Sequence, residues 1–396
     1  MTNASASSRE HLLLYEPRTE GHHLGWLRFI AEDLLAAGFN LSIAADLRAG
    51  SRERVEEQLA GLQNDIHLLP AYDESDRRHL DGKARSVAHC LEASGAENVF
   101  LCALDEIASH CWRRATFGLR PPAALRGQMG GIYHRPRFLA TSKWSLDRWL
   151  KAPGFERLLR EGWWRQMLFV DEFLAAELQS IHPSSPVFFL PDPCPPGYDG
   201  DPIAAKNMLE IPRNRKVFLF YGTGARRKGL HLAVEAMRQL PPESPVFLLC
   251  AGQQNPSGKT AAVLAQLVRQ NRACLLDHYV TVKEEKMCFE ASDAVLLPYL
   301  NHFGTSGVLS RAMSAGKPVI VSDEQLLGRL TRERRLGLVF PSGNSPALRD
   351  CISQIAQLSA TDAAPFAAAA RDYAKIYSRE AFRTALVKSF APGSRT

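Results

Sequence analysis

The chain has 396 residues, of which 45% are hydrophobic and 23% charged, and its formal net charge is +6. This composition is typical of a globular protein and excludes a collagen-like or disordered chain. The sequence contains no apolar run of 18 residues, and its polar start MTNASASSREH argues against a signal peptide. The eight cysteines are dispersed without a C-x-x-C pair, which predicts reduced thiols in a cytoplasmic protein. The length suggests two domains.

The positive charge is concentrated in one segment. Residues 111–170 hold twelve Lys or Arg and three Asp or Glu, a net of +9, whereas the other 336 residues have a net of −3. Five of the six tryptophans, at positions 112, 144, 149, 163 and 164, lie in the same segment. Cationic and interfacial aromatic residues favour peripheral contact with an anionic membrane. The open alternative is a set of core tryptophans beneath a solvated arginine face. No nucleic-acid motif accompanies the segment, so we expect no nucleic-acid partner.

The first half alternates strands and helices. Apolar periodicity predicts strands at 11–15, 40–46, 98–104, 166–170 and 187–191, and helices at 24–38, 84–94 and 171–180. This alternation implies a parallel sheet wound by right-handed crossovers. Residues 183–202 then contain seven prolines and two glycines, which disfavour a helix or a central strand. We therefore place a domain boundary near residue 190.

The second half repeats the alternation. The predicted strands are 216–222, 245–252, 293–299 and 317–323, with a short strand or loop at 278–282. The predicted helices are 230–240, 259–270, 283–292, 307–316, 346–357, 361–376 and 379–390. The sequence thus predicts an α/β protein with two doubly wound, Rossmann-like domains, 1–190 and 191–376, followed by a helical segment, 377–396.

Ligands of doubly wound sheets bind beyond the carboxyl ends of the strands, and three loops are expected there. Residues 222–229, GTGARRKG, join a strand to a helix and combine glycines with three cations, which suits a diphosphate. A solvated basic turn is the alternative. Residues 302–307, HFGTSG, open a helix and could receive a phosphate or sugar hydroxyls, or simply cap that helix.

The third loop is Glu20-Gly21-His22-His23, between the first strand and the first helix. Its imidazoles could orient a substrate or stabilise charge, and a polar helix entry is the alternative. Neither an H-x-x-x-H spacing nor a nearby carboxylate set supports a metal, so we expect no metal site.

Segments from 191 to 340 resemble the GT-B-fold glycosyltransferases, specifically the retaining family four type, or glycosyl transferases group 1. The resemblance rests on PDP, KVFLFYG followed by RKG, VFLLCAG, ASDAVLLPY and SGVLSRAMSAGKPVIVSD, in that order. Its most specific part is Ala312-Met313-x-Ala315-Gly316-x-Pro318-Val319. YEPRTEGHHLGWLRFIAEDLLAAG is similar to the opening of the family's first domain, and helix 379–390 is similar to the helix that crosses back to that domain.

The resemblance implies two Rossmann-like domains facing each other across a cleft. The second would bind a nucleotide-diphosphate-sugar and the first a glycan or lipid-linked acceptor. A hexosyl group would be transferred with retention, without a metal or cofactor, in polysaccharide biosynthesis at or near the inner membrane face. The resemblance assigns catalytic roles to His22 and Lys228. It assigns donor binding to Gly21, Gly222, Thr223, Arg227, Thr305, Ser306, Gly307 and Arg311.

The chain departs from the family's Glu-x7-Glu pair. The two glutamate positions are Phe303 and Arg311, and the arginine expected five residues before Lys228 is Thr223. An arginine in place of a ribose-binding carboxylate reverses donor and acceptor roles in the hydrogen bond. This departure keeps a second hypothesis open, in which the chain is a non-catalytic GT-B-fold binding partner of an active glycosyltransferase.

Overall fold

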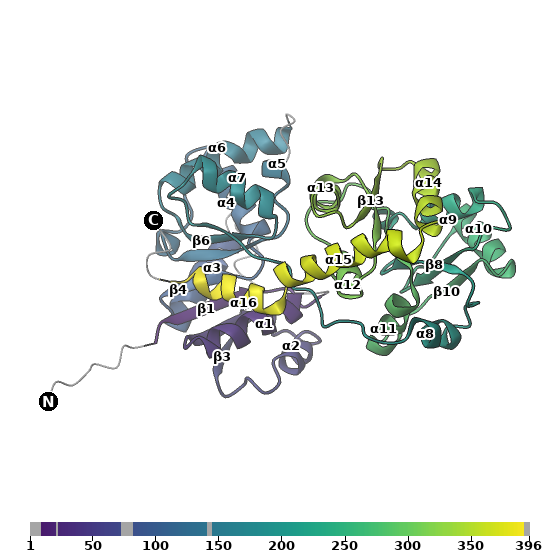
Figure 1. The fold of residues 1–396 in the computed structure, drawn as a ribbon. Helices are drawn as coiled ribbons and strands as arrows, with labels where there is room; N and C mark the ends of the chain where they lie inside the picture. Colours follow the sequence, from purple (N-terminus) through teal and green to yellow (C-terminus); the bar gives the residue numbers. More distant parts are fainter. Residues whose placement is uncertain (1–8, 21–22, 73–81, 141–144, 392–396) are drawn as a thin grey trace. The chain divides into compact units, whose positions relative to one another are not determined.

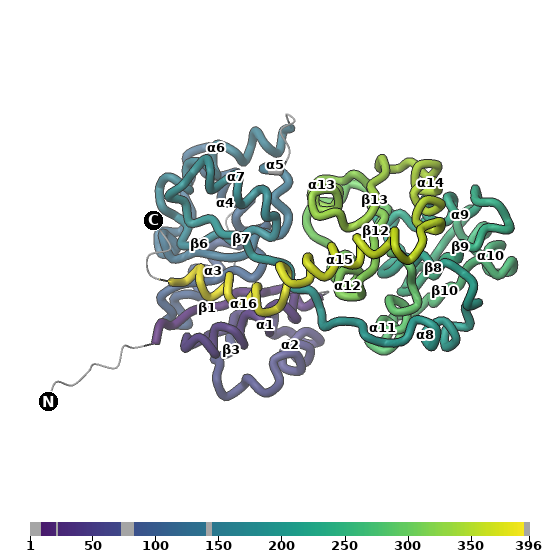
Figure 2. The backbone as a smooth tube through the Cα atoms, in the orientation of Figure 1, coloured from purple at the N-terminus to yellow at the C-terminus, as the bar shows by residue number. Residues whose placement is uncertain are grey.

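The structure is a computed structural model that describes residues 9–20, 23–72, 82–140 and 145–391. The chain divides into two units, Met1–Pro191 with Phe382–Thr396, and Asp192–Ala381. Each unit is built on one parallel sheet with helices packed against it, as the ribbon in Figure 1 and the backbone in Figure 2 show. The predicted α/β class with two doubly wound domains is confirmed.

The first unit contains a seven-stranded sheet in the order β3-β2-β1-β4-β5-β6-β7. Its strands are β1 (His11–Glu16), β2 (Asn40–Ala45), β3 (Ile66–Pro70), β4 (Asn98–Leu101), β5 (Met129–Tyr133), β6 (Trp164–Phe169) and β7 (Val187–Phe189). Its helices are α1 (His23–Ala36), α2 (Arg52–Gln58), α3 (Gly82–Ser94), α4 (Asp105–Thr116), η2 (Ala123–Leu125), α5 (Arg137–Ala140), α6 (Leu146–Arg160) and α7 (Glu172–Ile181).

The central strand β1 is a continuous apolar run because both of its faces are buried. Leu12 and Leu14 point into one core, with α1 and α2. Leu13 and Tyr15 point into the other, with α3, α4, α6 and α7. Because successive side chains of a strand alternate between the faces, a strand covered on both sides must be apolar throughout.

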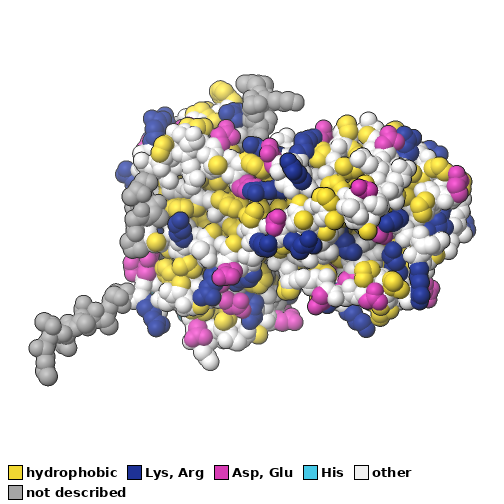
Figure 3. All heavy atoms as spheres, in the orientation of Figure 1, with side chains coloured by type: hydrophobic (Ala, Val, Ile, Leu, Met, Phe, Trp, Pro, Cys, Tyr) yellow, Lys and Arg dark blue, Asp and Glu magenta, His cyan; other side chains and the backbone are white. Residues whose placement is uncertain are grey.

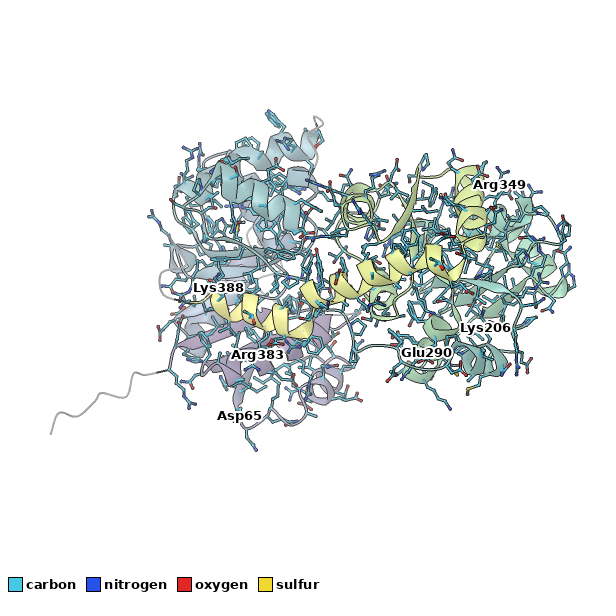
Figure 4. All side chains as sticks on the ribbon, viewed as in Figure 1. Asp65, Lys206, Glu290, Arg349, Arg383 and Lys388 are labelled. Carbon is cyan, nitrogen blue, oxygen red and sulfur yellow. The ribbon has the colours of Figure 1, made fainter. Side chains whose placement is uncertain are left out.

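The second unit contains a six-stranded sheet in the order β10-β9-β8-β11-β12-β13. Its strands are β8 (Lys216–Tyr221), β9 (Val246–Ala251), β10 (Ala273–Leu276), β11 (Ala294–Leu297), β12 (Val319–Ser322) and β13 (Gly337–Phe340). Its helices are α8 (Pro202–Met208), η3 (Arg226–Lys228), α9 (Leu230–Gln239), α10 (Gly258–Arg269), α11 (Val282–Ala291), α12 (Gly307–Ser314), α13 (Gln325–Glu333), α14 (Ser345–Ala356) and α15 (Ala360–Ile376). Lys206 on α8 and Glu290 on α11, labelled in Figure 4, mark two helices that pack together.

The last helix, α16 (Arg379–Lys388), carries the chain from the second unit to the first. From Phe382 onward the residues belong to the first unit, where Phe382, Leu386 and Phe390 enter the same core as α1. Arg383, labelled in Figure 4, lies 3.9 Å from the buried Asp33 carboxylate. The sequence predicted a helix at 379–390, and α16 occupies most of that range.

Most expected elements are present, with three kinds of difference. The strand expected at 98–104 ends at Leu101 because Leu104 already caps α4. Residues 278–282 hold no strand, since the edge strand β10 lies earlier, at Ala273–Leu276. Several elements were not anticipated: α2, β3, α4, β5, α5, α6, α8, α13 and β13.

Most of the described tryptophans in the basic segment 111–170 belong to the core. Trp112, Trp163 and Trp164 are buried, whereas Trp149 is 55% exposed, and Trp144 lies outside the described residues. Three of the four described tryptophans of this segment are therefore core residues, as the alternative interpretation of the segment predicted. Among the residues that the structure describes, no helix is long and apolar enough to cross a bilayer.

Gly154 permits the close packing of α6 on α4. A Cβ atom at this position would lie 1.8 Å from the carbonyl oxygen of Trp112. We predict that Gly154→Ala lowers the free energy of unfolding by about 1–3 kcal/mol, because the helices must separate. Gly25→Ala is the matched control, since Gly25 also lies in a helix of the first unit but has nothing within 4 Å of its Cβ position. Denaturant unfolding measures both, and equal stabilities of the two variants would contradict the packing argument.

Candidate functional site

The candidate site lies where the strand order of the second sheet reverses. Strand β8 pairs with β9 on one side and with β11 on the other. The loops that follow β8 and β11 leave the same edge of the sheet and lead to α9 and α12. Such a topological switch point is where doubly wound sheets bind ligands.

The loop 222–229 lies directly on the backbone that follows β9. Gly222 N–H donates to the carbonyl of Ala251 at 2.9 Å, and Gly224 N–H donates to that of Gln253 at 2.8 Å. The buried Gln254 side-chain amide donates to the Gly222 carbonyl. A Cβ atom on Gly224 would lie 1.6 Å from the carbonyl oxygen of Gln254. The glycine is therefore required by the close approach of two loops.

The cationic part of this loop forms the short helix η3. Gly229 ends it with a φ of +79°, and a Cβ there would lie 1.9 Å from the carbonyl oxygen of Pro298. Leu300 N–H donates to the Arg227 carbonyl at 2.8 Å, which ties the loop after β8 to the loop after β11. Thr223 and Arg227 have exposed side chains, whereas Lys228 is half-buried.

Tyr299 connects the two predicted phosphate-binding loops. The Lys228 ammonium donates to the Tyr299 hydroxyl at 2.8 Å and lies 4.0 Å from the centre of its ring. The same hydroxyl lies 3.3 Å from the Ser306 Oγ, and the tyrosine is only 1% exposed. A buried aromatic thus holds one cation beside the N-terminus of α12, where backbone N–H groups favour an anion.

The predicted residues of the second loop also cap α12. The Ser306 hydroxyl accepts from Val308 N–H at 3.3 Å as the helix N-cap, and Gly307 is the first helical residue. The Thr305 hydroxyl donates to an Asp192 carboxylate oxygen at 2.7 Å. The capping alternative therefore holds for Ser306, and capping leaves the other N-terminal N–H groups to bind an anion.

Arg311 lies one helical turn beyond Gly307 and faces a carboxylate on another helix. Its Nη1 donates to the Gly307 carbonyl at 3.1 Å, and its Nε lies 2.9 Å from Glu285 Oε2. The Glu285 carboxylate also accepts from the Tyr198 hydroxyl at 2.9 Å and the Tyr221 hydroxyl at 2.5 Å. We call Arg311, Glu285, Tyr198 and Tyr221 the arginine–glutamate cluster.

The charge states within this cluster follow from burial and from the carboxylate. Burial acts to lower the pKa of Arg311, but the nearby Glu285 carboxylate outweighs it and the pKa is raised. Burial first, and then Glu285, raise the pKa values of Tyr198 and Tyr221 well above the usual value. Both phenols therefore stay protonated and donate to Glu285.

In the first unit, Gly21 and His22 lie outside the described residues, so their predicted roles stay predictions. The neighbouring His23 begins α1, and its Nδ1 lies 3.0 Å from an oxygen of the buried Glu16. The other Glu16 oxygen accepts from Arg18 N–H at 2.9 Å. This polar group stands at the carboxyl end of β1, the switch point of the first sheet.

The residues of the candidate site that were missed in the sequence include Asp192, Tyr198, Tyr221, Glu285 and Tyr299. Tyr299 ends the predicted strand 293–299, and Asp192 belongs to the PDP motif, so both carried a local signal. Glu285 carried none, since it is one of several charged residues in the helix KEEKMCFEAS. In the described part of the chain, no group of three or more His, Cys, Asp or Glu side chains could hold a metal ion.

The model of glycosyl transferases group 1 matches residues 203–375. WcaL of Escherichia coli K12, assigned by its name to colanic acid biosynthesis as a glycosyltransferase, is 22% identical over 272 residues. That match spans 64% of this chain but only 61% of the length of WcaL.

Two solved structures extend the likeness over both units. WaaG, a glycosyltransferase involved in lipopolysaccharide biosynthesis, has a TM-score of 0.65 at 16% identity, with 97% of this chain and all of WaaG covered. Anabaena HepE, solved in complex with UDP, has a TM-score of 0.68 at 12% identity, with 96% and 99% covered. The resemblance indicated by the sequence motifs is confirmed. Most of the second unit, residues 203–375, matches the model of glycosyl transferases group 1, and the chain as a whole has the GT-B fold.

Proposed function

We propose that the chain is a glycosyltransferase that moves a hexosyl group from a nucleotide-diphosphate-sugar to a glycan or lipid-linked acceptor. The observation that carries this proposal is the contact of Lys228 with Tyr299, which places a cation beside the capped N-terminus of α12. This arrangement suits a diphosphate, because ammonium and backbone N–H groups both stabilise its negative charge. The relatives support the donor and acceptor classes, since HepE is solved with UDP-glucose and WaaG and WcaL are named for glycan biosynthesis.

The proposed reaction breaks the bond between the anomeric carbon and the leaving phosphate oxygen. The acceptor hydroxyl oxygen forms the new bond on the same face, which retains the configuration, and its proton passes to the departing phosphate. Lys228 and the first turn of α12 stabilise the charge that develops on the diphosphate. With these cationic and dipolar groups in place, we propose that a metal ion is not required. The second unit binds the donor and the first binds the acceptor.

The main experiment measures binding and turnover together. UDP-, GDP-, ADP- and TDP-sugars are tested for thermal stabilisation of the full chain, and those that bind are then incubated with glycan and polyprenyl-phosphate-sugar acceptors. The proposal expects stabilisation by one nucleotide class and transfer that continues in the presence of a chelator. If none of these nucleotide-sugars stabilises the chain, the proposal is overturned.

The replacement of both motif glutamates favours one second candidate function. Phe303 and Arg311 leave the donor site without the family's carboxylate pair. A chain that binds a nucleotide-sugar but transfers nothing to a broad acceptor set would be a non-catalytic partner of an active glycosyltransferase. Both the glycosyltransferase and the non-catalytic partner would bind the nucleotide-sugar, and only the glycosyltransferase would transfer the sugar.

Lys228→Ala tests the diphosphate site. We predict at least about tenfold weaker nucleotide-diphosphate binding, since a hydrogen bond to a charged group is worth about 1.5–3 kcal/mol. The matched control is Lys216→Ala, because Lys216 begins the same strand, β8, at its opposite end and pairs with Asp293 at 3.7 Å. Calorimetric titration compares the two, and equal losses of affinity would show that Lys228 acts only through net charge.

We also propose that the first unit contacts an anionic membrane through a small apolar patch. The patch consists of Phe117, Leu119, Leu146 and Trp149, which are 64%, 50%, 61% and 55% exposed. The rings of Phe117 and Trp149 lie 6.5 Å apart, where α4 ends beside α6. Basic side chains stand near apolar ones over α6 in Figure 3. Apolar side chains with flanking cations suit a surface of anionic lipid.

Phe117→Ser/Trp149→Ser tests this patch by sedimentation with phosphatidylcholine vesicles that contain or lack phosphatidylglycerol. We predict at least about tenfold weaker partition to the anionic vesicles, because burial of one large apolar side chain contributes about 1.5–3 kcal/mol. Ile203→Ser/Met208→Ser, which alters two exposed residues of α8 in the second unit, is the control. Unchanged partition of the patch variant would remove the membrane proposal.

A further inference from the structure

We propose that Arg18 and Lys83, in the first unit, bind an oxyanion carried by the acceptor, a phosphate or a carboxylate group. The inference deepens the proposed function and rests on it, because the first unit is there assigned to the acceptor. It adds the chemical class of that acceptor. Glu106 compensates one of the two positive charges, and we call Arg18, Lys83 and Glu106 the charged triad.

The charged triad lies at the switch point of the first sheet. Strand β1 pairs with β2 on one side and with β4 on the other, so the strand order reverses there. Arg18 stands two residues beyond the end of β1, and Glu106 is the second residue of α4, the helix that follows β4. Lys83 is the second residue of α3, the helix that follows β3. All three therefore lie at the carboxyl edge of the sheet, where doubly wound domains bind their ligands.

The two cations of the charged triad share one carboxylate. Arg18 Nη2 contacts Glu106 Oε1, and the Lys83 ammonium donates to Glu106 Oε2 at 2.5 Å. The triad therefore has one positive charge in excess. The side chains of Arg18, Lys83 and Glu106 are 37%, 59% and 50% exposed, so a solute can reach them. Exposed ion pairs stabilise a fold very little, so folding alone gives little reason to gather three charges at this edge.

Arg18 and Lys83 also repel each other. Burial, and after it the charge of Arg18, lower the pKa of Lys83. An anion that contacts both side chains would offset this repulsion. The contacts with Glu106 use Nη2 and Nζ, whereas an arginine has five N–H donors and a lysine three. Donors therefore remain on both side chains for the oxygens of a phosphate or a carboxylate, which accept charge-assisted hydrogen bonds.

The backbone that carries Arg18 is fixed before a ligand arrives. The Glu16 carboxylate is 1% exposed, accepts from Arg18 N–H at 2.9 Å and lies 3.0 Å from His23 Nδ1. Pro17, between Glu16 and Arg18, restricts this backbone further through its fixed φ. The loop therefore presents Arg18 at a defined point of the carboxyl edge, which lowers the entropic cost of binding.

The experiment measures whether an oxyanion strengthens the binding of a sugar. Glucose, galactose and mannose are compared with their 6-phosphates and their uronic acids by calorimetric titration into the full-length chain. Saturating UDP, GDP or ADP occupies the donor site, and the same titrations into Lys228→Ala provide a second way to remove phosphate binding there. We expect at least about tenfold tighter binding of an anionic sugar than of its neutral form, as charge-assisted hydrogen bonds predict.

Two variants distinguish an anion site from a structural ion network. Arg18→Gln/Lys83→Gln should reduce the preference for the anionic sugar to less than about twofold and leave the melting temperature unchanged. Glu106→Gln should act in the opposite direction and tighten binding of the anionic sugar about fivefold, the effect of one unit charge about 4 Å away in water. If the double variant does not fold, Lys83→Gln replaces it and should weaken that binding by a similar factor. Weaker binding in Glu106→Gln would show a structural network and overturn the proposal.

Arg126→Gln/Arg160→Gln is the matched control. It removes the same charge from two exposed residues at the opposite edge of the same sheet, where Arg126 precedes β5 and Arg160 precedes β6. Both side chains donate to backbone carbonyls, those of Glu161 and Glu156. The control should keep the preference for the anionic sugar. An equal loss in the control would show an effect of net charge alone and would contradict the site.

A further pair of ligands separates the two sources of an oxyanion. A polyprenyl-phosphate-linked sugar and octyl glucoside, which is neutral, are compared in the same detergent. If Arg18→Gln/Lys83→Gln weakens the binding of only the polyprenyl-phosphate-linked sugar, the charged triad binds the phosphate next to a lipid. If it weakens the binding of the soluble anionic sugars, the triad binds a charged group on the sugar itself. Either result supports the proposal.

The failures of the inference and of the proposed function are distinguishable. If no nucleotide-sugar binds, the proposed function is overturned, but the sugar titrations need no donor and still test the charged triad. If neutral and anionic sugars bind equally, or if Arg18→Gln/Lys83→Gln keeps the preference, the inference is overturned and the donor site is unaffected.

Discussion

The candidate donor site depends on one buried phenol. The Tyr299 hydroxyl binds the Lys228 ammonium and lies beside the Ser306 hydroxyl, and its backbone carbonyl accepts from the Ser322 hydroxyl at 2.6 Å. The Tyr299 side chain therefore holds a flexible lysine beside the start of α12, and its backbone is tied to the end of β12. A lysine side chain loses much rotamer freedom when it is held in this way. Because Tyr299 imposes that order before a ligand arrives, the cation is preorganised for an anion.

Sequence patterns indicated much of this fold because buried parallel strands and amphipathic helices have regular signals. The apolar run of β8 and the helix α9 after it were both anticipated. Elements that were missed lack such signals. Strand β5 reads MGGIY, and Gly131 is there because a Cβ would lie 2.3 Å from the Leu101 carbonyl. Helix α6 contains Pro153 and packs through Gly154, two residues that normally weaken a helix assignment.

The residues of the candidate site also fall into those with a local sequence signal and those without one. Loop residues of the candidate site, such as Lys228 and Ser306, could be predicted from their place after a strand. Glu285 could not, because its meaning depends on Arg311, 26 residues away and on another helix. Alone, an arginine at a glutamate position suggests a lost function. Paired with a carboxylate that two phenols hold, its charge is compensated, and replacing only one partner of such a pair is costly.

The local excess of positive charge has a different meaning in the structure than in the sequence. Tryptophan and arginine were counted together over residues 111–170, yet Trp112 is fully buried between aromatic neighbours and belongs to the core. At least four cations of the segment form ion pairs in the described part of the chain: Arg113 and Lys151 with Asp147, Arg120 with Glu161, and Arg165 with Glu10. The exposure of each residue, and not the composition of the segment, therefore shows which side chains lie at the surface. Trp149 and Phe117 meet that criterion, so the membrane argument rests on them and not on the composition of the segment.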